Sequence, residues 1–279
     1  MTYIPIDGRP FTVSMGLRAL DIAQWIEVDS NLESELGLKR DLLHKHHDQV
    51  FATLPQGEQG SRETLLLLKD YLSQNFPERF PNGVTVDESL HPLEAAALLV
   101  QEDLVVMSPH EDQWVLTAAC VCFPSRWDLT EKVGANLHEI HGPVPHYAER
   151  IGDATNAMFG KFTQDRPVWR VNWTILDSPD LFQPSGALRD VARSEPQEGA
   201  FGDTTYFRTE RQTLRVLPSG DVLFTIRNRV NSLNELATIS PEFRENLGLT
   251  LATTSDETRG YKGWHPMWAQ LLAWSEGEI

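Results

Sequence analysis

The sequence predicts an α+β fold, and three observations lead to that prediction. A helical hydrophobic period runs through the first third of the chain, and runs rich in β-branched and aromatic residues follow in the middle. Aromatic side chains at helical spacing return near the C-terminal end. We therefore expect one architecture in which helices pack on an antiparallel sheet.

The predicted N-terminal helices rest on the spacing of their apolar residues. Leu65, Leu68 and neighbouring leucines share one helix face, which indicates a helix over residues 62–75. The same pattern predicts helices over residues 18–26 and 33–47. Pro55, Gly57 and Gly60 separate the helix over residues 33–47 from the helix over residues 62–75.

Five strands are predicted in the middle of the chain, over residues 104–107, 114–123, 168–176, 206–217 and 221–230. Pro218 and Gly220 supply the backbone angles of a tight turn, so the last two strands should form a hairpin. The Pro-, Ser- and Gly-containing residues 177–203 are predicted to be a surface excursion.

A broken helix is predicted between the second and third strands. It runs from about residue 132 to residue 140, is interrupted by Pro143 and Pro145, and resumes to about residue 162. A terminal helix carrying Trp268 and Trp274 should pack its aromatic side on the body of the protein.

This order of elements is that of a PAS-type sheet with an added helical region, although periodicity alone supports only α+β. We predict one domain in which residues 1–89 form a mainly helical N-terminal region. Residues 90–235 would form the PAS-like core, and residues 236–279 a C-terminal extension.

Composition and charge exclude several functions. The chain has 24 Lys and Arg residues against 40 Asp and Glu residues, a formal charge of −16, and no basic run that would bind nucleic acid or an anionic membrane. The nearly apolar residues 114–123 are too few to cross a bilayer, and the first residues lack the pattern of a leader, so we expect a cytoplasmic protein. Cys120 and Cys122 are too few for a zinc or iron–sulfur site and are expected to be buried thiols.

Three histidines cluster in the segment LHEIHGPVPHY: His138, His141 and His146. His138 and His141 would share a helix face, but a zinc site needs a third ligand that the segment does not provide. A single imidazole is enough for haem iron, and Gly142 and the prolines after His141 would stiffen the chain beside it. From the residues alone, the simpler role of capping a helix C-terminus is favoured for His141.

Polar residues are unusually dense on two of the later strands. Strand alternation places Arg170 and Asn172 on one face of their strand. In the next strand Arg208, Glu210 and Gln212 share a face, and Arg211 points the opposite way. A solvated sheet face explains this pattern, and so does a polarised pocket in which Glu210 holds a protonated amine.

Several strings together resemble the haem-dependent oxidative N-demethylase α-subunit family. They are FRTERQTLRVLPSGDVLFTIR, LVQEDLVVM, CFPSRW, KVGANLHEIHGPVPHY, RVNW and YKG. The resemblance extends from about Gly16 to Tyr261, and the strings occur in the family's order and spacing.

The resemblance implies a PAS-fold subunit that binds haem b and oxidises a small secondary amine with O2 and NADPH-derived electrons. In the characterised case dimethylamine gives a primary amine and formaldehyde. Separate flavin and iron–sulfur reductase subunits would supply the electrons, which implies a hetero-oligomer. The chain fits that division of labour because it has no G-x-G-x-x-G loop and too few cysteines for a cluster.

Carried over residue by residue, the resemblance makes His141 the axial ligand of the haem iron, with His138 and His146 as reserves. The candidate catalytic residues are Glu210, Arg170, Asn172 and Gln212. The candidate haem contacts are Arg208, Arg211, Arg227, Arg126 and Trp127. The sequence leaves open which polar strand residues face the distal pocket and which face the propionates.

Two other functions remain open. A haem PAS gas or redox sensor would share the axial histidine but would have an apolar distal face, so Glu210 favours the enzyme. A non-catalytic subunit that has lost its cofactor is the second alternative.

Overall fold

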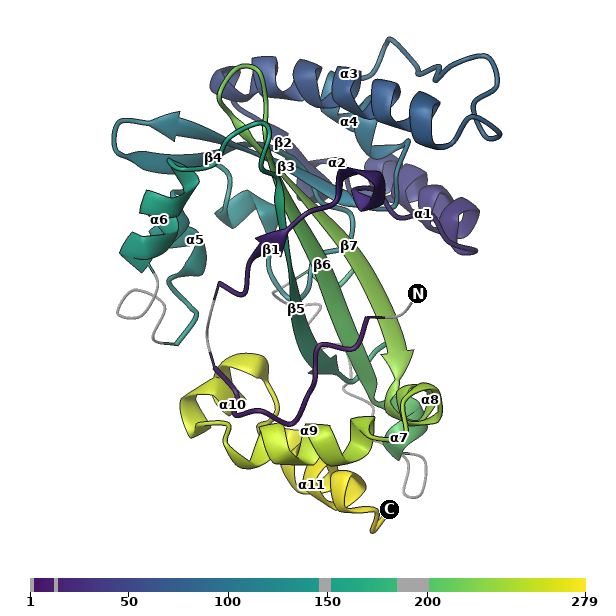
Figure 1. Cartoon of the computed structure of the whole chain (residues 1–279), viewed down its shortest axis with the longest axis vertical. Coiled ribbons are helices and arrows are strands. Elements are labelled where there is room, and N and C mark those ends of the chain that lie inside the picture. The colour runs from purple at the N-terminus through teal and green to yellow at the C-terminus, as the bar shows by residue number, and fades with distance from the viewer. Residues whose placement is uncertain (1–2, 13–14, 146–151, 185–200) are drawn as a thin grey trace.

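The computed structural model describes residues 3–12, 15–145, 152–184 and 201–279. Within these ranges one antiparallel sheet of seven strands is packed with helices on both faces and at its lower end (Figure 1). The predicted α+β class is confirmed.

All five predicted strands are present, and β5 has the predicted bounds. They are β3 (Asp103–His110), β4 (Gln113–Cys120), β5 (Val168–Leu176), β6 (Tyr206–Val216) and β7 (Val222–Ser232). Two short edge strands, β1 (Arg18–Ala19) and β2 (Phe51–Thr53), were not predicted because so few residues show no period. The strand order is β1-β5-β6-β7-β3-β4-β2, so the two strands before the broken helix and the three after it close into one sheet.

The helices fall into three groups. The N-terminal group comprises η1 (Ile22–Gln24), α1 (Leu32–Lys45), α2 (His47–Val50), η2 (Pro55–Gly57), α3 (Glu58–Asn75) and α4 (Pro92–Ala97). The middle group comprises η3 (Leu129–Glu131), α5 (Leu137–His141) and α6 (Asp153–Phe159). The C-terminal group comprises α7 (Phe201–Thr204), α8 (Leu233–Ile239), α9 (Phe243–Ala252), α10 (Asp256–Lys262), η6 (His265–Met267) and α11 (Trp268–Glu276).

The helix predicted over residues 18–26 is wrong. The segment contains only β1 and the single turn η1. Its backbone groups bond to other parts of the fold instead: Arg211 donates to the carbonyls of Gln24 and Trp25, and the Tyr71 hydroxyl donates to the carbonyl of Ala23. Tertiary contacts therefore override the local helical pattern.

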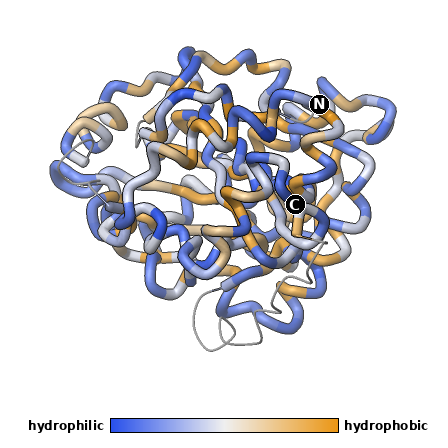
Figure 2. Tube along the Cα trace, turned by 90° about the horizontal axis from the view of Figure 1, so that it is seen from below, coloured by the Kyte–Doolittle hydropathy of each residue, from blue (hydrophilic) through white to orange (hydrophobic). Residues whose placement is uncertain are grey.

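The two faces of the sheet bury different clusters, because alternate strand residues point to opposite sides. We call face A the side to which Val105 and Leu214 point, where they pack against α5 and α6. Face B is the side to which Leu104 and Val106 point, where they pack against α1, α3 and α4. Figure 2 shows hydrophobic residues interspersed with hydrophilic ones along the whole chain.

The C-terminal helices pack on the lower end of the sheet. Ile175 and Phe207 are buried against Phe243, Trp264 and other residues of α7–α11. The Trp173 ring stacks between the rings of Phe207 and Trp264, with centroid distances of 5.2 Å and 5.6 Å. The predicted aromatic contact of the terminal helix with the body is confirmed by Trp274, which is 1% exposed.

No helix of the described residues is long and apolar enough to span a membrane. Cys120 and Cys122 are both buried free thiols, as predicted.

Lys39 is an unusual part of the face B core, because it is completely buried. Its Nζ donates to the carbonyl oxygens of Ala97, Val100 and Glu102 at 3.1, 2.9 and 2.5 Å. These bonds fix the chain between α4 and β3 to α1, so Lys39 connects the N-terminal helices to the sheet.

We expect Lys39→Met to lower the free energy of unfolding by about 3 kcal/mol, because three buried carbonyls lose their donor. Lys45→Met is the matched control in the same helix: Lys45 makes an exposed ion pair with Asp41, and its loss should change stability by less than about 0.5 kcal/mol. Urea unfolding followed by circular dichroism measures both. Equal stability of the two variants would contradict the role of Lys39.

Candidate functional site

The pairing of β5 with β6 brings four of the predicted site residues together on face A. Arg170 lies opposite Gln212, and Asn172 lies opposite Glu210. Directly opposed residues in an antiparallel pair point to the same side, and Leu214, two residues after Gln212, belongs to the face A cluster. The face predicted from strand alternation is therefore the one that also packs α5 and α6.

Glu210 is the centre of this polar group. Its Oε2 accepts hydrogen bonds from Asn172 Nδ2 at 3.2 Å and from Gln212 Nε2 at 3.0 Å. The side chains on this part of face A are neither fully buried nor fully exposed, and β1 pairs only with Val168 and Trp169 of β5. A half-buried carboxylate with two amide donors is suited to holding a polar or cationic group.

Helix α10 adds two titratable residues that the sequence analysis did not name as site residues. Burial lowers the pKa of Lys262 to about 8; the charge of Glu210 opposes this shift and that of Arg170 adds to it. Loss of hydration raises the pKa of Tyr261, although the residue is 43% exposed, and the charge of Glu210 acts in the same direction. The YKG string contains both residues. Because it lies far from the strands in the sequence, the sequence analysis could not predict that Tyr261 and Lys262 lie near Glu210 and Arg170.

Two hydrogen bonds fasten the end of α10 to β5. Lys262 Nζ donates to the Trp173 carbonyl at 2.6 Å, and Trp264 Nε1 donates to the Ile175 carbonyl at 3.1 Å. Gly263 ends α10 at φ 70°, a left-handed conformation that glycine adopts without strain, and so turns the chain toward that strand. Lys262 is thereby held at the border of the polar group.

His141 ends the short helix α5, whose beginning is capped by the Asn136 side chain. Its Nδ1 lies 2.8 Å from the Leu137 carbonyl oxygen. A carbonyl only accepts, so Nδ1 carries the proton and the lone pair of the neutral ring is on Nε2. Burial lowers the pKa of His141, and the positive charges of Arg170, Lys132 and His138 act in the same direction.

The surroundings of His141 are mainly apolar. Leu137 is buried in the face A cluster, and Ile140, Phe162 and Trp127 pack against that cluster. The predicted partner residue His138 is more open: its side chain is 38% exposed and its Nε2 lies 3.4 Å from Asp153 Oδ1. His146 lies outside the described residues.

Arg126, beside Trp127, holds the chain before α5 in place. Its guanidinium pairs with Asp177, and its backbone N–H donates to the Gln183 carbonyl at 2.6 Å. Its φ is 62°, a left-handed conformation that is uncommon for arginine. These contacts connect the segment after β4 to the start of the excursion after β5.

The other three arginines hold protein groups together. Arg208, completely buried, donates to the carbonyls of Phe123 and Leu181 and to Asn228 Oδ1. Arg211 points to face B, opposite to Glu210, as predicted from alternation, and binds the segment after β1. Arg227 also points to face B. The three arginines therefore hold parts of the fold together, and the haem contacts predicted for them stay a prediction.

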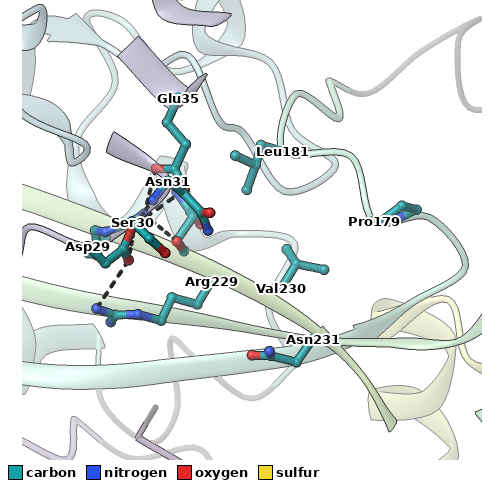
Figure 3. A pocket seen from close by; sticks show the side chains of 11 residues that line it. Asp29, Ser30, Asn31, Glu35, Pro179, Leu181, Arg229, Val230 and Asn231 are labelled. Atoms are coloured by element: carbon teal, nitrogen blue, oxygen red, sulfur yellow. Dashed lines mark hydrogen bonds and ion pairs between the residues drawn. The ribbon is translucent and has the colours of Figure 1, made fainter. Parts of the chain in front are cut away.

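A cleft of about 360 Å³ lies beside the end of β7 (Figure 3). Its charged groups are paired with one another: Arg227 lies 2.7 Å from Asp29 and 2.8 Å from Glu35, and Arg229 lies 3.8 Å from Asp29. Since these pairs satisfy the charges within the protein, the cleft does not compete with face A as the candidate site.

The described residues contain no group of three or more His, Cys, Asp or Glu side chains that could hold a metal ion by themselves.

The chain matches the family model described as "Haem-dependent oxidative N-demethylase, alpha subunit-like" over residues 16–272. It belongs to this family. The match covers most of the chain, including the strands, the broken helix and α10. The family resemblance of the sequence motifs is confirmed, and the family name indicates haem dependence and an oxidoreductase.

The donor set on face A fits the cofactor in the name of the N-demethylase family. A haem needs an apolar wall and one neutral imidazole, and α5 provides both in Leu137 and His141. The hydrogen bond from Nδ1 to Leu137 fixes the ring, as is usual for metal-binding histidines.

The pKa of Lys262 tests the electrostatics of this site independently of any cofactor. Glu210→Gln removes a negative charge that favours the ammonium, so the pKa of Lys262 should fall below about 8. Arg170→Gln removes a repelling positive charge, so the pKa should rise. NMR titration of the protein reductively methylated with ¹³C-formaldehyde measures it, with Lys262→Arg assigning the resonance. Shifts in the same direction in both variants would contradict the arrangement.

Proposed function

We propose that this chain is the haem-binding, PAS-like subunit of an oxidative N-demethylase that converts a small secondary amine, O2 and NADPH-derived electrons to a primary amine and formaldehyde. The observation that carries the proposal is the placement of a neutral, hydrogen-bonded His141 on the same face as the Glu210 polar group. Membership of the N-demethylase family supports it.

His141 would hold the haem b iron through Nε2, and Leu137, Ile140 and Trp127 would provide apolar walls beside the ring. Bound in this way, haem supplies the redox chemistry that activates O2. Glu210 would bind the amine N–H group, and Asn172 and Gln212, both of which donate to Glu210 Oε2, would fix the direction of that carboxylate. Arg170 would stabilise negative charge that develops in the site.

The electrons would come from a flavin and an iron–sulfur cluster on partner subunits. Cys120 and Cys122 are buried in the face B core, which supports a chain without a cluster of its own. We propose that the assembly is a cytoplasmic hetero-oligomer and that residues 90–235 are the PAS-like core of a single domain.

Substitution of His141 tests the cofactor ligand. We expect the purified protein to show a Soret band and His141→Ala to lose most of its haem, because the axial bond to iron is lost. His138→Ala is the matched control from the same helix, and its spectrum should be unchanged because its side chain pairs with Asp153 at the surface. An unchanged Soret band in His141→Ala would remove His141 from this role, and absence of haem in the parent protein would contradict the function.

The carboxylate of Glu210 distinguishes an enzyme from a gas sensor. With dimethylamine, O2 and a competent reductase, Glu210→Gln should lower the rate of formaldehyde release by about 100-fold while the haem spectrum persists. Glu242→Gln, at an exposed position before α9, is the control and should keep the full rate. If the parent protein yields no formaldehyde from any secondary amine, a haem sensor becomes the better account.

A further inference from the structure

Lys262 combines three features that a plain surface lysine lacks. Its Nζ donates to a backbone carbonyl of β5, that of Trp173, at 2.6 Å. The same nitrogen lies 5.5, 5.8 and 6.0 Å from the ring centroids of Trp173, Trp264 and Phe11. It also interacts electrostatically with Glu210 and Arg170 on face A. The ammonium is therefore in a protected environment at the border of the candidate amine site.

We propose that Lys262 is the proton acceptor for the amine substrate, so that Lys262 and the bound amine together carry one exchangeable proton. This inference rests on the proposed function, since it concerns the same site. The step is R2NH2⁺ + Lys262-NH2 → R2NH + Lys262-NH3⁺, in which one N–H bond breaks, one forms and no electron is transferred. It leaves the substrate nitrogen with the lone pair that oxidation requires.

The charges around Lys262 allow either Lys262 or the bound amine to be protonated, but not both. The charged groups that act on it are Glu210 and Arg170, and Tyr261, which Glu210 also affects, stays neutral because its pKa is raised. With Lys262 protonated, the site holds two cations and one carboxylate, and an ammonium substrate would add a third cation to a half-buried site. With Lys262 neutral, one ammonium substrate brings the site back to two cations and one carboxylate.

The environment of Lys262 allows both protonation states. The Trp173 carbonyl accepts from an ammonium or from a neutral amine, and the aromatic rings stabilise the cation when it forms. Burial lowers the pKa of Lys262 to about 8, which is low enough for the neutral form to be populated near neutral pH. A free alkylamine resembles an ordinary lysine, with a pKa of about 10.4, so it arrives as the ammonium.

Arg259 on the same helix provides a contrast. Its guanidinium lies over the Trp268 ring at 4.1 Å, and its Nε donates to the Thr254 carbonyl at 3.1 Å. An arginine stays protonated throughout the usable pH range and serves only as a structural cation. Lys262→Arg therefore keeps a donor and a cation at this position and removes only the ability to accept a proton.

Isothermal titration of dimethylammonium chloride into the haem-loaded protein tests the proposal, using two buffers of different ionisation enthalpy to count protons. For the parent protein we expect release of about one proton per amine bound at about pH 6.5, where Lys262 is charged and the amine must enter as the free base. At about pH 9.5 release should fall to nearly zero, because the proton passes to neutral Lys262.

The two variants should make the number of protons released per bound amine independent of pH, at about one for Lys262→Arg and nearly zero for Lys262→Met. Lys262→Arg should release about one proton at both pH values, because arginine cannot accept it. Lys262→Met should release almost none at either, because the site then lacks one positive charge and accepts the ammonium. At amine concentrations well below saturation, the formaldehyde rate of Lys262→Arg should also fall about 10-fold at about pH 9.5, because only the small free-base fraction of the amine can bind to the variant. If Lys262→Met does not fold, Lys262→Arg carries the test.

A pH-independent proton count in the parent protein, or a count for Lys262→Arg that follows it, would overturn the proposal and assign Lys262 a purely structural role at the edge of β5. The proposed function would survive either result. If dimethylammonium produces no binding heat and no formaldehyde in the parent protein, the proposed function fails as well, so the two failures can be told apart.

Discussion

The register between β5 and β6 is the constraint on which the candidate site depends. It aligns Arg170 with Gln212 and Asn172 with Glu210, so that four polar side chains from two strands meet on one face. A slip of β6 by one residue would move Glu210 and Gln212 to face B, the side on which α1, α3 and α4 pack. The hairpin between β6 and β7 and the packing of Leu214 on face A both oppose such a slip.

The two faces of the sheet treat charge differently, and this difference separates structure from function. On face B the ions are paired within the protein: Arg227 with Asp29 and Glu35, and Arg229 with Glu27. Such pairs hold helices and strands together when the attraction between the two ions offsets the cost of removing them from water. On face A, Glu210 accepts from amides, and the cations near it interact with it at longer range. A group arranged in this way retains the capacity to bind a ligand.

The sequence was sufficient to predict the five long strands and the shared face of Glu210 and Gln212, because each follows from a local period. Of the predicted broken helix, α5 and α6 are helical, whereas residues 132–136 form turns and a β-bridge to Val115. It failed over residues 18–26, where the backbone groups bond to Arg211 and Tyr71 from distant elements. The protein partners of Arg208 and Arg227 could not be predicted either, since an arginine in a strand shows its charge but not its partner. Lys262 was missed because its low pKa comes from burial between segments far apart in the chain.

The central claim is that His141 and the Glu210 group lie on two sides of the same haem site. A crystal structure of the haem-loaded protein with dimethylamine tests it most directly. Our account predicts iron bound to His141 Nε2 and the amine nitrogen hydrogen-bonded to the Glu210 carboxylate. Iron held by another residue, or haem bound in the cleft beside β7, would contradict it.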